Sequence, residues 1–333
     1  MSASLSILRA PLLALGLVAA GWPVADSVLS AQFWRSDRGR ITEAQVRGHM
    51  EMLASDALQG RASGTRDELI AATYIASQLR QWGLEPLGDD GGFVQAIATS
   101  RGKTWNVVAR ISGSDRRGTE AILLSAHLDH VGMRGTEGDT IFNGADDDAS
   151  GVTAVLELAR NLAAGRRPRR TILFAWFGSE EAGGAGSRHF ADHPPVPLTS
   201  IVANLQFEMI GRPDAAVAAN TLWLTGFERS TLGPALARRG ARLVADPHPA
   251  QNFFLRSDNI QFALRGVVAH TVSSYGLHRD YHAPTDDVSR IDFPHLTAAI
   301  RSMVEPIRWL AGSDFVPVWR PGLKPEVRRP GGA

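Results

Sequence analysis

Five short motifs along the chain carry the acidic and histidine side chains that bind zinc in catalytic sites. They are His127-Leu128-Asp129-His130, Asp146-Asp147-Asp148, Glu180-Glu181, Glu208 and His282. The sequence contains no cysteine, so a zinc site built on thiolates is excluded. Any zinc must then be held by imidazole and carboxylate groups, and this ligand set is typical of catalytic zinc rather than structural zinc.

The acidic triplet lies in a loop of small residues that runs from Asn143 to Gly151. A carboxylate in such a loop can approach two cations at once, and like charges at this density repel each other unless a cation neutralises them. A single acid-rich loop is more often a turn or a helix cap. The prediction of a metal site therefore depends on the combination of motifs.

Glu180 and Glu181 are neighbours in a loop, where adjacent side chains can face different directions. One of them can bind a metal while the other stays free, and a free carboxylate beside a metal-activated water is suited to act as a general base. Taken alone, such a pair more often belongs to an acidic surface loop.

The apolar pattern places these motifs at the ends of strands. Strands are expected at 93–98, 105–111, 121–126, 171–177, 201–207, 221–225 and 267–271, and helices after Thr42 and at 67–82, 150–164, 230–239 and 294–310. Open α/β sheets bind ligands beyond the carboxyl ends of their strands, which is where His127, the glutamate pair and Glu208 fall. We predict an α/β fold with a single globular domain, residues 42–312, whose mixed, mostly parallel central sheet is flanked by helices.

Composition gives no reason to expect a nucleic acid or a membrane surface as partner, because the net charge is +1 and no long run of one sign occurs. The N-terminus has the pattern of a signal peptide over residues 1–31, with Arg9 before an apolar stretch. This pattern predicts a periplasmic or secreted protein; an uncleaved membrane anchor is the alternative. Residues 313–333 are rich in Pro, Gly and Arg and are expected to form a flexible tail.

The motifs closely resemble, in order, the signatures of metallopeptidase family 28, a two-zinc group that includes bacterial leucyl aminopeptidases, aminopeptidase Y, glutamate carboxypeptidase and the glutaminyl cyclases. The resemblance extends from about Thr42 to about Leu310. It rests on Ser125 to His130, Asn143 to Gly151, Ser179 to Glu181, Asn204 to Arg212, and Tyr281 to Asp286. Each motif alone is weak, but five in order at compatible spacing are a strong signal.

The resemblance implies a zinc exopeptidase-like fold with two zinc ions per chain, bridged by Asp147. His127 and Glu208 would complete the ligands of one ion, and Glu181 with His282 those of the other.

Two further roles follow from the same resemblance. Glu180 would be the general base, and Asp129 would orient the ring of His127, as metal-bound histidines commonly require. The peptide bond between Asp147 and Asp148 would be cis.

The sequence departs from the commonest pattern of the family at two places. Many relatives have aspartate where this chain has Glu208, and Gln206 is the alternative donor, although a neutral amide is a poorer zinc ligand. Asn259 follows Asp258 where relatives often have histidine, which puts any substrate contact there in doubt.

The resemblance implies an exported aminopeptidase that hydrolyses peptides with a free N-terminus by a two-zinc bridging-hydroxide mechanism. A glutaminyl cyclase, a carboxypeptidase and a non-catalytic binding module on the same scaffold are the alternatives. A carboxypeptidase would need a basic anchor, for which Arg61, Arg256 and Arg279 are candidates. The chain has no room between Gln95 and Trp105 for the accessory domain that larger relatives carry there.

Overall fold

The computed structural model describes residues 39–100, 102–115 and 119–326. The predicted signal peptide, residues 1–31, lies outside the described residues. Within the described ranges, no helix has both the length and the apolar character needed to cross a membrane.

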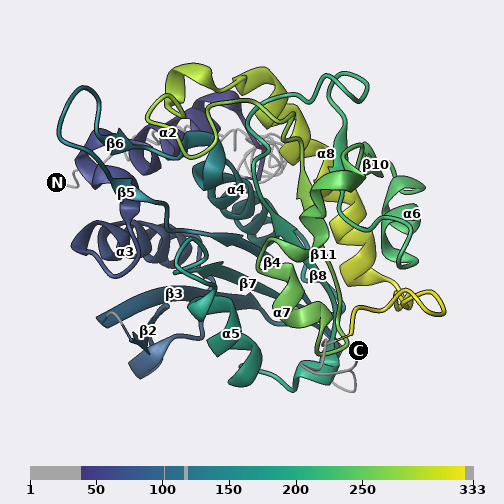
Figure 1. Ribbon diagram of the computed structural model, residues 1–333. Coiled ribbons are helices and arrows are strands. Elements are labelled where there is room, and N and C mark those ends of the chain that lie inside the picture. The colour runs from purple at the N-terminus through teal and green to yellow at the C-terminus, as the bar shows by residue number, and fades with distance from the viewer. Residues whose placement is uncertain (1–38, 101, 116–118, 327–333) are drawn as a thin grey trace, which may run out of the picture. The chain divides into compact units, whose positions relative to one another are not determined.

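A mixed sheet forms the centre of the described domain (Figure 1). Its strands lie in the order β1-β3-β7-β4-β8-β11-β9-β10, and β2 pairs with the N-terminal part of β3. The four central strands run parallel: β7 (Thr171–Phe177), β4 (Ala121–His127), β8 (Ile201–Phe207) and β11 (Val268–Ser273). Because their carboxyl ends point the same way, the residues that follow them gather along one edge, as predicted.

Further strands extend the parallel centre on both sides, and the two that border it pair with it in the antiparallel direction. The outer strands are β1 (Glu85–Pro86), β2 (Val94–Thr99) and β3 (Gly102–Ile111) on one side, and β9 (Leu222–Leu224) and β10 (Leu243–Ala245) on the other. Two short strands, β5 (Gly132–Met133) and β6 (Ile141–Phe142), form a separate hairpin. The observed fold confirms the predicted α/β class with helices around a mostly parallel central sheet.

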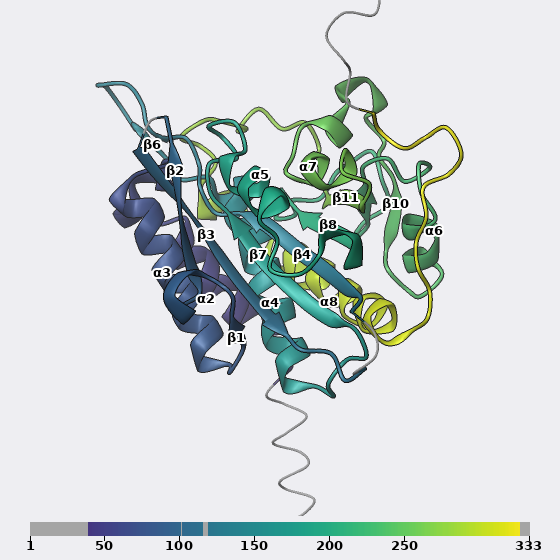
Figure 2. The ribbon, with the colours of Figure 1, turned by 90° about the horizontal axis from the view of Figure 1, so that it is seen from below.

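Helices cover both faces of the sheet (Figure 2). The larger core includes α2 (Glu43–Leu53), α3 (Arg66–Gln81), α4 (Gly151–Ala164), α6 (Leu232–Ala237) and α8 (Phe293–Gly312). The smaller core, on the opposite face, includes α5 (Ala185–Asp192) and α7 (Asn259–Ala263). Strand β4 is buried along its whole length between the two cores, which explains its continuous apolar sequence.

Local signals account for the first helices. Thr42 and Gln45 form the capping box expected from their spacing, with the Gln45 Oε1 accepting the Thr42 N–H at 3.1 Å.

Helices α5 and α7 were not predicted, because they span only 8 and 5 residues and are too short for a helical apolar repeat to be recognised.

The segment that follows α8 keeps contact with the domain over more residues than its composition suggested. The ring of Trp319 packs against His270, with 5.2 Å between ring centroids, and the Arg320 N–H donates to the Arg229 carbonyl at 2.8 Å. Phe315 stacks on Trp309 of α8. These residues of the predicted C-terminal tail therefore pack against the domain through their aromatic side chains.

Candidate functional site

The residues predicted to bind metal or to act in catalysis lie at the carboxyl ends of the parallel strands. His127 is the last residue of β4, Glu180 and Glu181 follow β7, and Glu208 comes directly after β8. His282 is supplied by the long loop between β11 and α8, where its backbone is left-handed at φ 51°.

Asp147 reaches the same place from the turn that leads into α4. The Asp147-Asp148 peptide bond is cis, as the family resemblance implied. The buried Asp148 carboxylate accepts the N–H groups of His127 at 3.2 Å, Gly151 at 3.0 Å and Met209 at 3.2 Å. One carboxylate therefore joins the end of β4, the start of α4 and the end of β8.

A second buried carboxylate holds this turn from the other side. Asp286 accepts the N–H of Asp146 at 3.0 Å and that of Asp147 at 3.1 Å. Gly144 precedes the turn at φ 58°, and a side chain there would collide with the Asp147 carbonyl and the ring of His130. Only glycine suits both the backbone conformation and the close approach.

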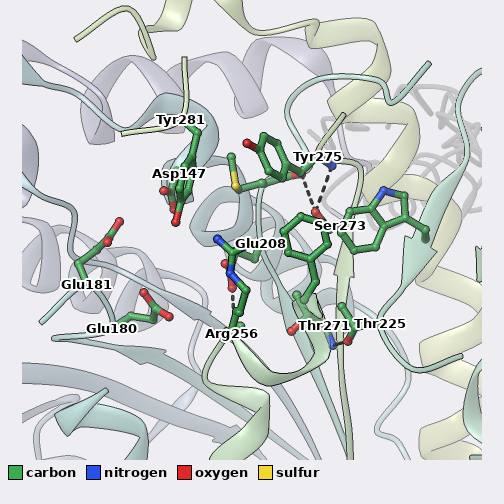
Figure 3. Close-up of a pocket in the computed structure, with 14 residues that line it drawn as sticks. Asp147, Glu180, Glu181, Glu208, Thr225, Arg256, Thr271, Ser273, Tyr275 and Tyr281 are labelled. Atoms are coloured by element: carbon green, nitrogen blue, oxygen red, sulfur yellow. Dashed lines mark hydrogen bonds between the residues drawn. The ribbon is translucent and has the colours of Figure 1, made fainter. Parts of the chain in front are cut away.

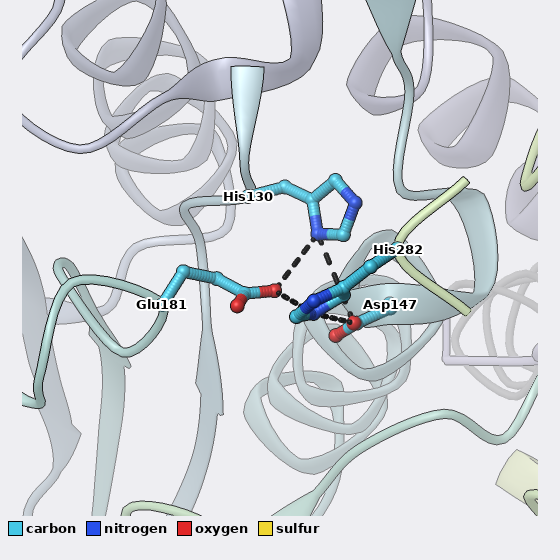
Figure 4. Close-up of side chains that lie close together, drawn as sticks. All are labelled: His130, Asp147, Glu181 and His282. Carbon is cyan, nitrogen blue, oxygen red and sulfur yellow. Dashed lines mark hydrogen bonds and ion pairs between the residues drawn. The ribbon is translucent and has the colours of Figure 1, made fainter. Parts of the chain in front are cut away.

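The side chains converge on Asp147 (Figure 4). Its Oδ1 lies 3.2 Å from His127 Nε2, and its Oδ2 lies 3.2 Å from His282 Nε2. The same His282 nitrogen lies 2.8 Å from Glu181 Oε1. An imidazole on each oxygen of one carboxylate, with a further carboxylate beside it, is the arrangement expected for a residue that can bridge two cations.

Glu208, rather than Gln206, faces the site (Figure 3). Glu208 lines a cavity together with Asp147, Glu180 and Glu181. The Gln206 side chain is buried elsewhere and has no hydrogen-bond partner among the described residues. Glu208 also accepts a hydrogen bond from the Ser257 hydroxyl. The Glu208 carboxylate thus lines the cavity, although its side chain is one methylene longer than the aspartate that many relatives have at this position.

His130 belongs to the site, although no role was predicted for it from the sequence. Its Nδ1 lies 3.1 Å from Glu181 Oε1 and 3.8 Å from Asp147 Oδ2. Ligand atoms of His130, Asp147, Glu181 and His282 all lie within 4.8 Å of one another. The only signal in the sequence was its place three residues after His127, in the same loop.

The electrostatics of these residues fit a bound cation. Burial raises the pKa of Glu208 to about 7, against the opposing charge of His127. Burial would lower the pKa of His282, but its contacts with the carboxylates of Asp147 and Glu181 outweigh this effect and raise it to about 9. The His127 Nε2 and Asp147 Oδ2 atoms are buried without a hydrogen-bond partner in the described chain. Buried nitrogen and oxygen atoms that lack hydrogen bonds and lie among several acids are suited to bind a divalent metal ion.

Asp129 has a different contact from the one expected. The His127 Nδ1 lies 3.1 Å from the backbone carbonyl oxygen of Asp129 and 3.8 Å from its carboxylate. The Asp129 carboxylate instead accepts the N–H of Glu180 at 2.9 Å and that of Glu181 at 3.3 Å. Its backbone therefore orients the ring, while its side chain positions the two glutamates.

Replacing Asp129 by asparagine is expected to weaken zinc binding by about 10–100-fold, the usual cost of losing a partner that supports metal ligands. An amide cannot accept both glutamate N–H groups, so the Glu180-Glu181 turn loses one restraint. Zinc titration followed by mass spectrometry of the native protein measures the change. Unaltered zinc affinity would show that this carboxylate is not needed to position the pair.

Arg61 is excluded as an anchor for a substrate carboxylate. It is 1% exposed, and its guanidinium donates to the backbone carbonyls of Leu53, Leu128, Asn143 and Gly144. The group thereby ties the turn before α4 to the loop after β4.

Arg61→Met is expected to lower the free energy of unfolding by on the order of 3 kcal/mol, because it leaves buried carbonyls without donors. Arg279→Met is the matched control, since Arg279 is exposed and should change stability by less than about 0.5 kcal/mol. Urea denaturation of both variants measures the difference. Equal stability of the two variants would contradict the structural role of Arg61.

A sequence model of peptidase family M28 matches residues 106–305. Leupeptin-inactivating enzyme 1 of Streptomyces exfoliatus is 31% identical over 207 residues, which cover 60% of this chain and 43% of that protein. An aminopeptidase of Pseudomonas aeruginosa is 38% identical over 121 residues, covering 35% of this chain and 20% of that protein. The chain thus spans less than half the length of these curated relatives.

Solved structures agree on the fold. A zinc aminopeptidase from Bacillus subtilis superposes with a TM-score of 0.66 at 15% identity, over 83% of this chain and 96% of that one. An aminopeptidase from Aneurinibacillus superposes with a TM-score of 0.63 at 16% identity, over 87% of this chain and 98% of that one.

Proposed function

Because this chain belongs to peptidase family M28, we propose that it is an exported, two-zinc aminopeptidase that removes N-terminal residues from peptides. The observation that carries the proposal is Asp147, whose two carboxylate oxygens each face a different imidazole, His127 on one side and His282 on the other. Relatives named as aminopeptidases support the substrate class. The signal peptide pattern of residues 1–31 supports export.

The residues divide into two ligand sets that share Asp147. We assign His127 and Glu208 to one zinc ion and Glu181 and His282 to the other, with His130 beside the second set. When bound, zinc supplies a water of lowered pKa and polarises the carbonyl of the peptide bond to be cleaved.

Glu180 is suited to move the proton. No hydrogen bond or ion pair occupies its carboxylate in the described part of the chain, whereas the Glu181 carboxylate contacts His130 and His282. Burial raises the pKa of Glu180 well above its usual value, against the charge of His127, and the neighbouring acid Glu208 raises it further. A carboxyl with a raised pKa can accept the proton of the attacking water and donate it to the leaving amine.

The acids of the cavity are also suited to contact the amino group of the substrate. A peptide with a free N-terminus presents an ammonium group next to the bond to be cleaved, and Glu180 and Glu208 are acids that this group can contact. A blocked N-terminus has no such charge.

The decisive experiment compares an aminoacyl amide with its N-acetylated counterpart, with and without a chelator. We expect cleavage of the free amine alone, abolished by the chelator and restored by zinc. Cleavage of the acetylated compound at the same rate would overturn the assignment as an aminopeptidase. Cyclisation of an N-terminal glutamine without release of an amino acid would instead indicate a glutaminyl cyclase.

A further inference from the structure

The cavity that begins at the acids extends away from them into a mixed apolar and polar pocket (Figure 3). Its volume is about 70 Å³, several times the roughly 10–15 Å³ that one water molecule needs. Beyond the acids, its walls include Met209, Trp223, Phe253 and Tyr275, with Thr225 and Arg256 among the polar groups. The space is suited to one side chain of a bound substrate.

Among the described residues, Arg256 is the only basic one that lines this cavity. Its guanidinium carbon lies 5.0 Å from the centre of the Phe253 ring, and it forms no ion pair within the described residues. In Figure 3 its side chain extends toward the acidic end of the pocket. Burial raises the pKa of Tyr275, and the charge of Arg256 acts against that rise, so the guanidinium acts electrostatically on this wall residue.

Most hydroxyl groups of the pocket already donate a hydrogen bond within the protein. Thr271 donates to Asn259 Oδ1 at 3.1 Å, and Ser273 donates to the Met209 carbonyl at 3.1 Å. The Thr225 hydroxyl accepts the Thr271 N–H at 2.9 Å, so its own hydrogen is available to a ligand. Apart from the acids, the pocket therefore offers donors, which include the Arg256 guanidinium and the Thr225 hydroxyl.

We propose that Arg256 binds the side-chain carboxylate of the first residue, so that the preferred substrates are peptides with an N-terminal glutamate or aspartate. The inference rests on the proposed aminopeptidase function and adds its substrate class. The ammonium group of such a residue faces Glu180 and Glu208, while its carboxylate faces Arg256 and Thr225. The methylene groups between them contact Trp223 and Phe253.

Substrates whose first side chain is neutral are disfavoured because they offer Arg256 no negatively charged acceptor. Leucine fills the apolar part of the pocket but offers the Arg256 guanidinium no acceptor. A hydrogen bond to a charged group contributes about 1.5–3 kcal/mol, which corresponds to roughly 10–100-fold in rate. Glutamine has the size of glutamate but lacks the charge, so it is the appropriate reference substrate.

The test measures kcat/KM for the 4-nitroanilides of glutamate, glutamine and leucine on the zinc-loaded protein. The wild type should prefer glutamate to glutamine, and Arg256→Gln should lower that ratio by about 10–100-fold. Arg279→Gln removes an exposed arginine that does not line the cavity and should keep the wild-type ratio. Cleavage of the leucine compound with no preference for glutamate, or an unchanged ratio in Arg256→Gln, would overturn the inference while leaving the proposed function intact.

Two further measurements separate the remaining explanations. If Arg256→Gln slows Leu-Gly but not Leu-Gly-amide, the arginine binds a C-terminal carboxylate and the inference is wrong. Calorimetry with free L-glutamate and L-glutamine requires no turnover. Tighter binding of glutamate that is lost in Arg256→Gln supports the inference even if no anilide is cleaved, a result that would overturn the proposed function alone.

Discussion

Replacing Glu180 by glutamine is expected to lower kcat by about 10²–10⁴-fold while the protein keeps its full zinc content. The Glu180 carboxylate has no hydrogen-bond or ion-pair partner among the described residues, and burial raises its pKa, so its loss removes a proton acceptor rather than a ligand. Its N–H would remain held by Asp129, because the backbone is unchanged. Metal analysis and steady-state kinetics on the same preparation test the prediction.

Glu181→Gln is the matched comparison, one residue along the same turn. The Glu181 carboxylate lies 2.8 Å from His282 Nε2 and 3.1 Å from His130 Nδ1, so its loss should reduce zinc content at one of the two sites. A neutral amide is a weaker ligand for zinc than a carboxylate. The roles are reversed if Glu180→Gln is the variant that loses zinc, and the general-base role is wrong if that variant stays active with both ions bound.

Asp147→Asn is expected to have the largest effect on metal binding, because both ligand sets share this side chain. Zinc affinity should fall by more than the roughly 10–100-fold that follows loss of an outer partner, and hydrolysis should become undetectable. The amide nitrogen would replace one carboxylate oxygen that now faces His127 or His282 at 3.2 Å. Zinc per chain after dialysis is the direct measurement.

The control for Asp147→Asn is Asp139→Asn, which removes an exposed carboxylate from the hairpin loop between β5 and β6. It should keep wild-type zinc content and rate. If Asp147→Asn retains two zinc ions per chain, Asp147 does not bridge them.

Much of the fold could be predicted from the sequence because its central strands are buried on both faces. The runs 171–177 and 201–207 match the observed β7 and β8 at both ends, since continuous apolar residues are required along their full length. The short helices α5 and α7 could not be predicted in the same way. Each buries only a few residues, and its position depends on the sheet face that it covers.

Some residues of the site could likewise be predicted from the sequence, and others could not. Residues at strand ends, such as His127 and Glu208, could be placed because the strand determines where the next residue lies. The role of His130 depends on the close approach of Gly144 from another loop. The contact of Asp129 with His127 through its backbone carbonyl could not be distinguished in advance from a contact through its carboxylate. Arg256 reaches the pocket from a loop whose path no periodic pattern describes.

The contact between Asp286 and the turn around Asp147 has a consequence for when the protein can acquire metal. The bonded groups are separated by 140 and 139 residues, and the loop that provides Asp286 also provides His282. A nascent chain that ends before this loop lacks His282, one of the proposed ligands, and leaves the Asp147 turn without its support. We therefore expect the proposed zinc site to form only after this loop has been translated and has docked onto the sheet.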